Sequence, residues 1–405
     1  MPRWHRPNPE SPAAAAGAGH GLPTSAPTVG VEEEFFLVDP TSERLTASND
    51  LVVAAAARLG LDMDYELKRT QVEVNTPVCH NSTELRARVV EGRAIAAAAA
   101  REAHVGLLAS GVSPTLQQLA SVTDVPRYRT MAERYGRLVE EQEVCGCHVH
   151  VGVADHETAV LVCNHVRVWL PTLLAATANS PLHRGRDTGY ASWRAIMASR
   201  WPCAGPPPRF TSAEHYDAIV AMMIDSGNIL DPGMVYWDVR PSAHLPTVEV
   251  RVSDVPATVD ETVLLAMLVR ALVATAEREV REGIAAPPVA DEIVHAAYLC
   301  AAREGSTGRA VDVFTGRPTT AQQSFRAFLR YLGPQLEETG DRRCAVAMWE
   351  AILARGTGAM LQRRAFARRH AVADVVGALR RAFVDGPQTP PLSGGAHPAP
   401  DVPAL

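Results

Sequence analysis

The sequence predicts an α+β fold in which a largely antiparallel β-sheet carries helices on one face. Three observations support this prediction. Short segments alternate apolar and polar residues as half-buried strands do, and long segments of helical periodicity separate them. The spacing of the two kinds of segment lacks the regular βαβ repeat of a parallel sheet.

Five segments show the two-residue alternation of a strand. They are Val29–Val38, Gln71–Val78, Val144–Val153, Met234–Arg240 and Thr247–Ser253. Asn81 and Glu84 have the spacing of a capping box, which predicts a helix from there to about His104. Further helices are expected at Pro126–Glu143, His156–Ala178, Ala213–Ile229, Val259–Glu282, Asp291–Arg303, Ala321–Glu338 and Arg342–Phe383.

The length permits two or three domains, but continuous structured sequence without a linker or repeat favours a single domain over 29–384. The chain has 405 residues and 47% hydrophobic content, which is enough for a sizeable core. Residues 1–28 and 385–405 are rich in Pro, Ala and Gly, so we expect two disordered tails.

Composition excludes several classes of protein. The net charge of −6 and the pI near 6.2 argue against a nucleic-acid partner. The apolar run Leu264–Ala276 is interrupted by Arg270 and is shorter than the ~20 residues of a membrane span. Ala13–Ala16 is too short for a signal-peptide core. Seven scattered cysteines indicate reduced thiols, so we expect a cytoplasmic protein without a membrane partner.

The single lysine limits how this chain can bind a nucleotide. Lys68 follows no glycine-rich loop, so a Walker A phosphate loop is excluded, and Lys68 is assigned no role. The sequence also lacks a Gly-x-Gly-x-x-Gly fingerprint after a strand, a His-Glu-x-x-His motif and a Gly-x-Ser-x-Gly motif.

Alternation divides four of the predicted strands into one apolar face and one face of carboxylate, imidazole and guanidinium groups. The polar face is predicted to hold Glu32, Glu34, Gln71, Glu73, Asn75, His148, His150, Glu249, Arg251 and Ser253. Glu33 is the exception, since its carboxylate falls on the apolar face. It either caps the edge of the sheet or pairs with an arginine.

An ordinary solvated face explains any one of these strands, but it explains the set less well. A solvated face would favour Thr, Lys, Ser and Gln, whereas these positions hold mainly metal- and phosphate-binding residue types. Carboxylates two residues apart on a strand lie about 7 Å apart, which lets them flank metal ions. Their mutual repulsion is costly unless cations lie among them.

The segment Cys145–His150 invites a zinc interpretation that alternation opposes. In a continuous strand Cys145 and Cys147 point one way and His148 and His150 the other, so the four side chains converge on one ion only if a bulge at Gly146 interrupts the strand. Cys147 is better explained as a small core residue. A structural role remains an alternative for both histidines.

Arginine can supply the phosphate contacts, because its guanidinium binds phosphate and carboxylate oxygens in pairs. Of the 39 lysines and arginines, 38 are arginines, and most of these are expected at the surface, Arg200 among them. Arg194 lies in a Gly- and Pro-bounded region, and Arg240 lies on a predicted strand. Arg251 is the strongest candidate because it shares a strand face with Glu249.

With these motifs in place, the chain resembles the type 2 glutamate–cysteine ligases, in particular their bacterial carboxylate–amine ligase branch. The resemblance spans roughly residues 29–380. The matching stretches, in the family's order, are VGVEEEFFLVDP (29–40), QVEVNTPVC (71–79), CGCHVHVGV (145–153), NSPLHRGRDTGYASWRA (179–195) and WDVRPSAHLPTVEVRVSD (237–254).

The resemblance implies a glutamine-synthetase-like domain that holds ATP and Mg²⁺ against the sheet. It implies Glu32, Glu34, Glu73, His148 and Glu249 as metal ligands. Glu249 and Arg251 are then catalytic, and the substrate or nucleotide contacts are Asn75, Arg194, Arg240 and Arg251. The implied reaction joins L-glutamate, through its γ-carboxylate, to an amine such as that of L-cysteine. Homodimers are the commonest protein oligomers, and this general frequency is the only basis for expecting a homodimer here.

Three other functions stay open from the sequence. A ligase of the same mechanism could use another acid or amine, since the amine-binding residues match no motif. A guanidino phosphotransferase would transfer phosphate and stop. A non-catalytic metal- or nucleotide-binding regulator would bind without turnover.

Overall fold

A computed structural model describes residues 26–115 and 121–385. The predicted tails, 1–28 and 385–405, lie outside these residues apart from 26–28 and 385. Within the described part the main sheet has seven strands, all paired antiparallel, in the order β2-β3-β1-β5-β9-β8 with β4 on β1. These strands are β1 (Val29–Val38), β2 (Met63–Tyr65), β3 (Gln71–Asn75), β4 (Gly106–Leu108), β5 (Gly146–Gly152), β8 (Val239–Pro241) and β9 (Thr247–Asp254).

Two short hairpins and the helices make up the rest of the fold. The hairpins are β6–β7 (Leu182–His183, Arg186–Asp187) and β10–β11 (Arg309–Val311, Pro318–Thr320). The α-helices are α1 (Asn49–Arg58), α2 (Ser82–Glu102), α3 (Pro126–Tyr135), α4 (Arg137–Glu141), α5 (His156–Val166), α6 (Leu170–Thr177), α7 (Trp193–Ala198), α8 (Ala213–Asp225), α9 (Val259–Arg281), α10 (Asp291–Glu304), α11 (Ala321–Glu338), α12 (Arg342–Arg355), α13 (Gly358–Ala367) and α14 (Val372–Asp385). Short 3₁₀ turns are η1 (Arg167–Trp169), η2 (Pro232–Met234) and η3 (Gly305–Thr307).

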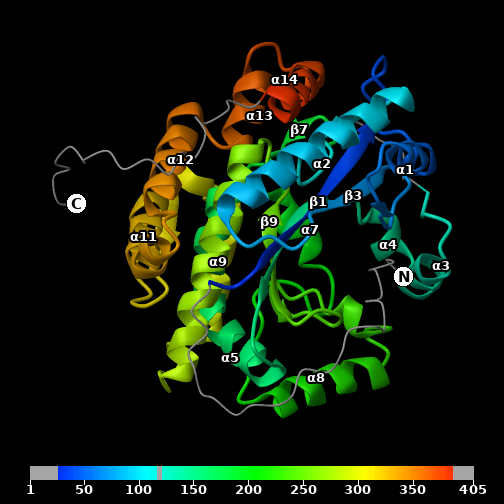
Figure 1. The fold of residues 1–405 in the computed structure, drawn as a ribbon. Helices are drawn as coiled ribbons and strands as arrows, with labels where there is room; N and C mark the ends of the chain where they lie inside the picture. The colour runs from blue at the N-terminus through cyan, green and yellow to red at the C-terminus, as the bar shows by residue number, and fades with distance from the viewer. Residues whose placement is uncertain (1–25, 116–120, 386–405) are drawn as a thin grey trace.

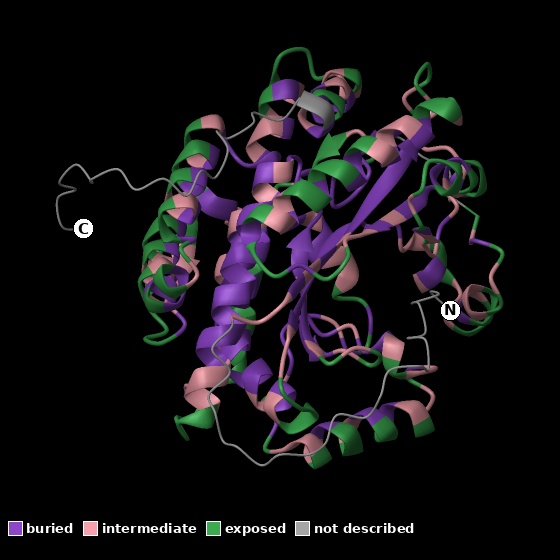
Figure 2. Ribbon diagram, in the orientation of Figure 1, coloured by how far each residue is buried: buried purple, intermediate pink, exposed green. Residues whose placement is uncertain are grey.

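Helix α9 covers the apolar face of the sheet. It runs beside the strands with α2 and α5 next to it, and α11 and α12 form an outer layer (Figure 1). Val31, Val149 and Val250 of the sheet share one buried cluster with Leu265 and Leu272 of α9. The central strands and α9 are accordingly almost entirely buried (Figure 2). The predicted fold class, an antiparallel sheet with helices on one face, is confirmed.

Most predicted elements are present, with differences where backbone conformation interrupts the periodicity. The predicted strand Met234–Arg240 is wrong over most of its length, since η2 ends at Met234 and β8 covers only Val239–Pro241. The predicted helix Arg342–Phe383 is three helices, because Gly356 (φ 95°) and His370 (φ 52°) take left-handed conformations. Helices α1 and α7, the short strands β2 and β4, and the hairpins β6–β7 and β10–β11 were not predicted.

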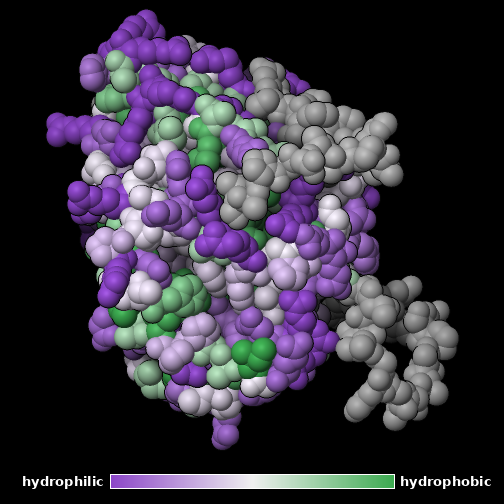
Figure 3. Space-filling view, turned by 90° about the vertical axis from the view of Figure 1, so that its left-hand side faces the viewer, coloured by the Kyte–Doolittle hydropathy of each residue, from purple (hydrophilic) through white to green (hydrophobic). Residues whose placement is uncertain are grey.

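One segment, His156–Thr177, has the length and apolar composition of a membrane-spanning helix. Its most apolar stretch is 83% buried inside the fold, and it comprises α5, η1 and α6 rather than one helix. Burial of this kind is that of a core segment. Figure 3, which views the side on which α11 lies in Figure 1, shows mainly hydrophilic side chains with small separate hydrophobic patches.

The unexpected carboxylate of β1 is explained by an arginine on α2. Arg93 donates from Nη2 to Glu33 Oε1 (2.6 Å) and from Nε to Oε2 (3.0 Å), and both side chains are 3% exposed. Nη2 also donates to Pro256 O (2.9 Å), and Thr262 Oγ1 donates to Glu33 Oε1 (2.6 Å). Of the two explanations left open for Glu33, pairing with an arginine is the correct one. The pair locks α2 and the start of α9 onto β1.

Arg93→Met should lower the free energy of unfolding by about 3–5 kcal/mol, because it leaves the Glu33 carboxylate buried without its partner. Adding Glu33→Gln should recover part of the loss, since the double variant has no uncompensated charge. Urea unfolding would measure both. Arg88→Met, which removes an exposed pair with Glu91, is the control, expected within about 0.5 kcal/mol of the parent. Equal losses in Arg93→Met and Arg88→Met would contradict the assignment.

Candidate functional site

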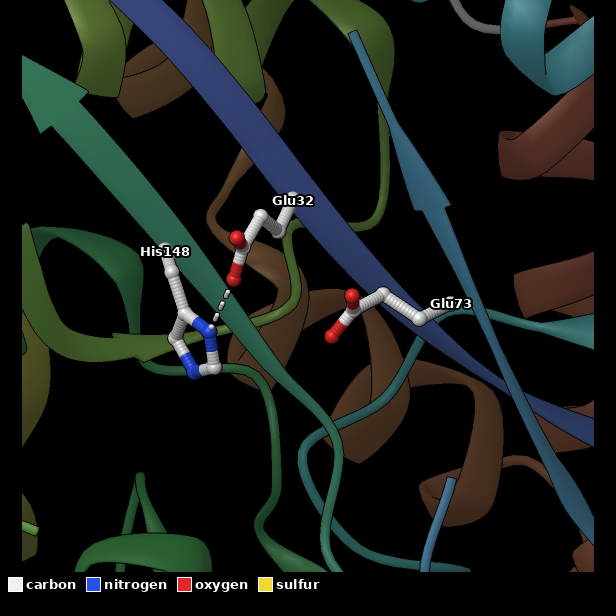
Figure 4. A group of neighbouring side chains, drawn as sticks. All are labelled: Glu32, Glu73 and His148. Carbon is white, nitrogen blue, oxygen red and sulfur yellow. Dashed lines mark hydrogen bonds and ion pairs between the residues drawn. The ribbon is translucent and has the colours of Figure 1, made fainter. Parts of the chain in front are cut away.

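The predicted metal ligands meet on the face of the sheet opposite α9. Cross-strand register brings them together: Glu32 lies directly opposite His148, Glu34 opposite Glu73, and His150 opposite Glu249. Cross-strand partners share a face of the sheet. Glu32, Glu73 and His148 extend from three neighbouring strands toward one another (Figure 4).

Glu32 is bound by both imidazoles. Its Oε2 lies 3.0 Å from Nδ1 of His148, and its Oε1 lies 3.1 Å from Nε2 of His150. Burial alone would raise the pKa of Glu32, but the hydrogen bonds with His148 and His150 outweigh it and hold that pKa well below its usual range. Glu32 is therefore an ionised carboxylate at neutral pH.

Glu249 is held by two arginines. Arg240 donates from Nε to Oε2 (2.8 Å), and Arg251 donates from Nη1 to Oε1. Burial opposes ionisation, yet Arg240 and Arg251 lower the pKa of Glu249 well below its usual range. Arg251 Nη1 also lies 3.3 Å from Nδ1 of His148, so this guanidinium sits between the carboxylate and an imidazole.

A third part of the site lacks such compensation. Glu66, in the loop between β2 and β3, joins Glu34 and Glu73. Burial, followed by the Glu34 charge, raises the pKa of Glu66 to about 8. Burial and the charges of Glu32, Glu66 and Glu34 raise the pKa of Glu73 well above its usual value. Asn75 Nδ2 donates to Glu73 Oε1 (3.1 Å) and to Asp64 Oδ2 (2.8 Å). In this part of the site carboxylates face one another.

Three groups of side chains have ligand atoms that all lie within 4.8 Å of one another, the separation that shared metal coordination needs. They are Glu32, Glu73 and His148; Glu32, His150 and Glu249; and Glu34, Glu66 and Glu73. All five residues predicted as metal ligands occur in these groups. His150 and Glu66 join them. Glu66 could not be found by alternation because it lies in a loop outside the predicted strands.

A β-bulge changes the predicted face of Ser253. Val149 lies opposite Val250 and Cys147 lies opposite Ser253, so Arg251 and Val252 of β9 together face the single residue His148 of β5. Past the bulge Ser253 is paired with Cys147, whose side chain belongs to the apolar core. The prediction that Ser253 shares the face of Glu249 is wrong, because the extra residue shifts the alternation by one.

The remaining predicted contacts lie in or beside this face. Arg240 uses Nη1 for the carbonyls of Gly233 (3.0 Å) and Val235, so most of its donors are engaged within the chain. Arg194, at the start of α7, is buried and donates from Nη2 to the carbonyl of Arg251 (3.1 Å). Arg200 forms a partly exposed pair with Glu141, as expected of a surface residue.

A second group of elements borders the polar face. A separate apolar cluster joins α3 and α4 to residues 201–237, the segment that includes α8. Tyr128 of α3 donates its hydroxyl to Tyr65 O (3.0 Å). Burial and then the charges of Glu66 and Glu73 raise the pKa of Tyr128, and burial raises that of Tyr236 to about 12. Lys68, which is buried, donates to Glu140 O (3.1 Å) and so ties the loop of Glu66 to α4.

The cysteines contribute no ligand atom to these metal-ligand groups. All seven lie in the described residues and are free, and Cys147 is fully buried in the apolar core, as predicted. Cys145 is also buried and accepts a hydrogen bond from Gln71 Nε2 (3.3 Å). The metal-ligand groups among the described residues contain no thiol.

Comparison with known sequences identifies the family. Residues 28–383 match the profile of "Glutamate-cysteine ligase family 2(GCS2)". The chain belongs to this family. A protein of Nocardia farcinica named "Putative glutamate--cysteine ligase 2-1" is 51% identical over 374 residues, 92% of this chain and 98% of that protein. A Mycolicibacterium vanbaalenii protein, "Putative glutamate--cysteine ligase 2-2", is 49% identical over 353 residues, 87% of this chain and 97% of that protein.

Solved structures share the fold of this family member. A glutamate–cysteine ligase from Francisella tularensis, crystallised in complex with AMP, has a TM-score of 0.65 and 11% identity, with 89% of both chains covered. A bifunctional glutathione synthetase from Pasteurella multocida has a TM-score of 0.62 and 14% identity, covering 89% of this chain and 52% of that one. At these identities the comparison shows the fold alone.

The raised pKa of Glu66 makes the stability of the metal-free protein depend on pH. Folding holds a proton on Glu66 that the unfolded chain releases near pH 4.5, so this contribution is complete below pH 4.5 and is lost as pH rises to about 8. The free energy of unfolding should therefore fall across this window by more than about 1 kcal/mol from Glu66 alone, since one pKa unit corresponds to ~1.4 kcal/mol.

Glu66→Gln should flatten the slope, and urea unfolding in EDTA between pH 5 and 8 would measure it. Glu338→Gln, an exposed substitution at the end of α11, is the control. An unchanged slope in Glu66→Gln would refute the assigned pKa.

Proposed function

We propose that this protein is an ATP- and Mg²⁺-dependent carboxylate–amine ligase that joins the γ-carboxylate of L-glutamate to the amine of L-cysteine. The observation that carries the proposal is the convergence of Glu32, Glu34, Glu66, Glu73 and Glu249, with His148 and His150, on one face of the sheet. Membership of the glutamate–cysteine ligase family 2, and relatives named for this activity that align along nearly all of their length, support the substrates.

The donor set fits a hard divalent cation. Carboxylate oxygens are the ligands that Mg²⁺ prefers, and the Glu34, Glu66 and Glu73 group consists of carboxylates alone. Burial and neighbouring carboxylate charges raise the pKa values of Glu66 and Glu73, and a bound cation would relieve this repulsion. Nε2 of His148, buried and without a hydrogen-bond partner among the described residues, adds a nitrogen donor. These carboxylates and His148 would hold Mg²⁺, which would supply positive charge to offset that of the phosphate groups of ATP.

The reaction requires activation of an unreactive carboxylate. Attack of a γ-carboxylate oxygen on the γ-phosphorus of ATP releases ADP and leaves an acyl phosphate. The amine then attacks the carbonyl carbon, loses a proton and expels inorganic phosphate. No protein nucleophile is needed, and the free cysteines belong to none of the metal-ligand groups among the described residues. The protein's task is to position two anionic reactants and to compensate their charge.

Arg251 is the residue placed to compensate charge on the transferred group. Its guanidinium contacts Glu249 and His148 on the face itself, and Glu249 keeps it ionised. Arg240 holds the other oxygen of Glu249 and thereby fixes the carboxylate. Asn75 orients Glu73 by its amide, and its own Oδ1 is buried and free of hydrogen bonds within the described residues. These contacts fix the rotamers of the face before substrates bind.

The direct test is ADP release with L-glutamate fixed and the amine varied. Glu73→Gln should reduce the rate at least about 100-fold, as loss of one electrostatic contact to a transition state does. Its apo-protein should melt within about 2 °C of the parent, because Gln resembles the protonated carboxyl that burial already favours. Glu338→Gln is the matched surface control. Full activity in Glu73→Gln would remove the metal assignment. Glu249→Gln is less informative, since it strands two buried arginines.

Oxygen transfer separates this reaction from phosphotransfer alone. With L-glutamate carrying ¹⁸O in its γ-carboxylate, an acyl phosphate intermediate delivers one ¹⁸O atom to inorganic phosphate in each turnover. Mass spectrometry of the phosphate would show it. A stable phosphorylated product would instead indicate a guanidino phosphotransferase. Binding of Mg·ATP without turnover across an amino-acid panel would indicate a regulator.

A further inference from the structure

The bulge in β9 sits at the centre of the candidate site. Arg251 and Val252 are the two bulged residues opposite His148, and the Arg251 side chain is the one that contacts Glu249 and His148. A bulge aims a side chain differently from a regular strand and leaves its main chain less well paired. Something must therefore hold the main chain of these two residues in place.

Arg194 makes that contact. Its Nη2 donates to the carbonyl of Arg251 (3.1 Å) and its Nη1 to the carbonyl of Val252 (3.4 Å). On the other side, the amide of Arg251 donates to the carbonyl of Asp238 (2.7 Å). The main chain of Arg251 is thus bound at both its amide and its carbonyl by residues outside the β5–β9 ladder. The contacts with Arg194 involve main-chain atoms, and their acceptors are the two bulged residues.

The start of α7 is pinned to β9 itself, which fixes where Arg194 points. Asp254, three residues beyond Arg251, accepts hydrogen bonds from Ser192 Oγ (2.8 Å), Ser180 Oγ (2.7 Å) and the amide of Asn179 (2.7 Å). Ser192 is the N-cap of α7, and the amide of Arg194 donates to Ser180 Oγ (3.1 Å). Asp254 is fully buried. Strand β9 therefore anchors helix α7, and Arg194 of α7 in turn contacts the bulge of β9.

Gly146 leaves the space that the guanidinium occupies. A Cβ atom at position 146 would collide with Nη2 of Arg194 and come within 3.1 Å of Nε2 of His148. The φ angle of Gly146 is not in the left-handed region, so close approach of the guanidinium is the reason that glycine is suited to this position.

We propose that Arg194 is a positioning residue: it holds the β9 bulge so that Arg251 faces Glu249 and His148, instead of contacting substrate or nucleotide itself. This proposal deepens the proposed ligase function, because it assigns the alignment of Arg251 to α7. It also accounts for Asn179, Ser180, Ser192 and Asp254, which the reaction does not otherwise use.

Hydrogen–deuterium exchange in the metal- and nucleotide-free protein tests the proposal without reference to activity. Arg194→Met should accelerate exchange of peptides within 247–254 about tenfold, because two hydrogen bonds to the bulge are lost. The matched control is Arg270→Met. Arg270 is likewise buried and donates to two main-chain carbonyls, those of Pro27 (2.7 Å) and His80 (2.6 Å), but from α9 on the opposite face. Its loss should leave exchange within 247–254 unchanged.

Kinetics give the second readout. Arg194→Met should lower kcat about 100-fold with little change in KM for the acid, as displacement of a catalytic group does. In the double variant Arg194→Met/Arg251→Met, kcat should be less than about threefold lower than in Arg251→Met alone, because both substitutions remove the same contact. Arg194→Lys should recover only part of the rate, because an ammonium does not bond both carbonyls in the same fork.

Two outcomes would overturn the proposal. One is unchanged exchange within 247–254 in Arg194→Met relative to Arg270→Met. The other is a loss confined to KM that Arg194→Lys restores and that adds fully to Arg251→Met, which would make Arg194 a substrate contact. If the parent showed no ligase activity, the proposed function would fail while the exchange experiment still decided the role of Arg194.

Discussion

The central constraint on this protein is the repulsion among carboxylates on one face of the sheet that is largely buried from solvent. Five glutamates approach within a few ångströms of one another or of shared imidazoles, in surroundings that disfavour charge. The molecule handles them in two ways. Hydrogen bonds with His148 and His150 keep Glu32 ionised, and the charges of Arg240 and Arg251 keep Glu249 ionised, whereas burial and neighbouring carboxylates favour the protonated forms of Glu66 and Glu73.

Such a face can exist only if the opposite face supplies the stability. Valines of β1, β5 and β9 pack on α9 in one continuous cluster, and Glu33 is paired with Arg93 in the same layer. Because alternation sends neighbouring residues of β1 to opposite sides, Glu32 and Glu34 serve the site while Glu33 locks the helices. Three consecutive glutamates thus divide between two faces of the sheet and two roles, a division that composition alone would not show.

Much of this arrangement is predictable from the sequence, because a period of two fixes the face of each strand residue. The positions of Glu32, Glu34, Glu73, His148 and Glu249 follow from it, as does the burial of Cys147. Ser253 escapes prediction because one extra residue in β9 inverts the alternation, and nothing in the letters VEVRVSD marks that bulge. Glu66 escapes prediction because a loop brings it to the site. The strand predicted at Met234–Arg240 is not formed over most of its length, since the 3₁₀ turn η2 ends at Met234 and β8 begins only at Val239.

The arginines differ in which groups accept their hydrogen bonds, and this difference indicates what each of them does. Arg194 and Arg270 donate to main-chain carbonyls, so they organise the backbone. Arg240 divides its donors between carbonyls and Glu249, so it fixes a side chain. The contacts of Arg251 within the described residues lie with Glu249 and His148 on the polar face. A guanidinium placed there, with its own backbone held by Asp238 and Arg194, can meet a developing negative charge without first having to move.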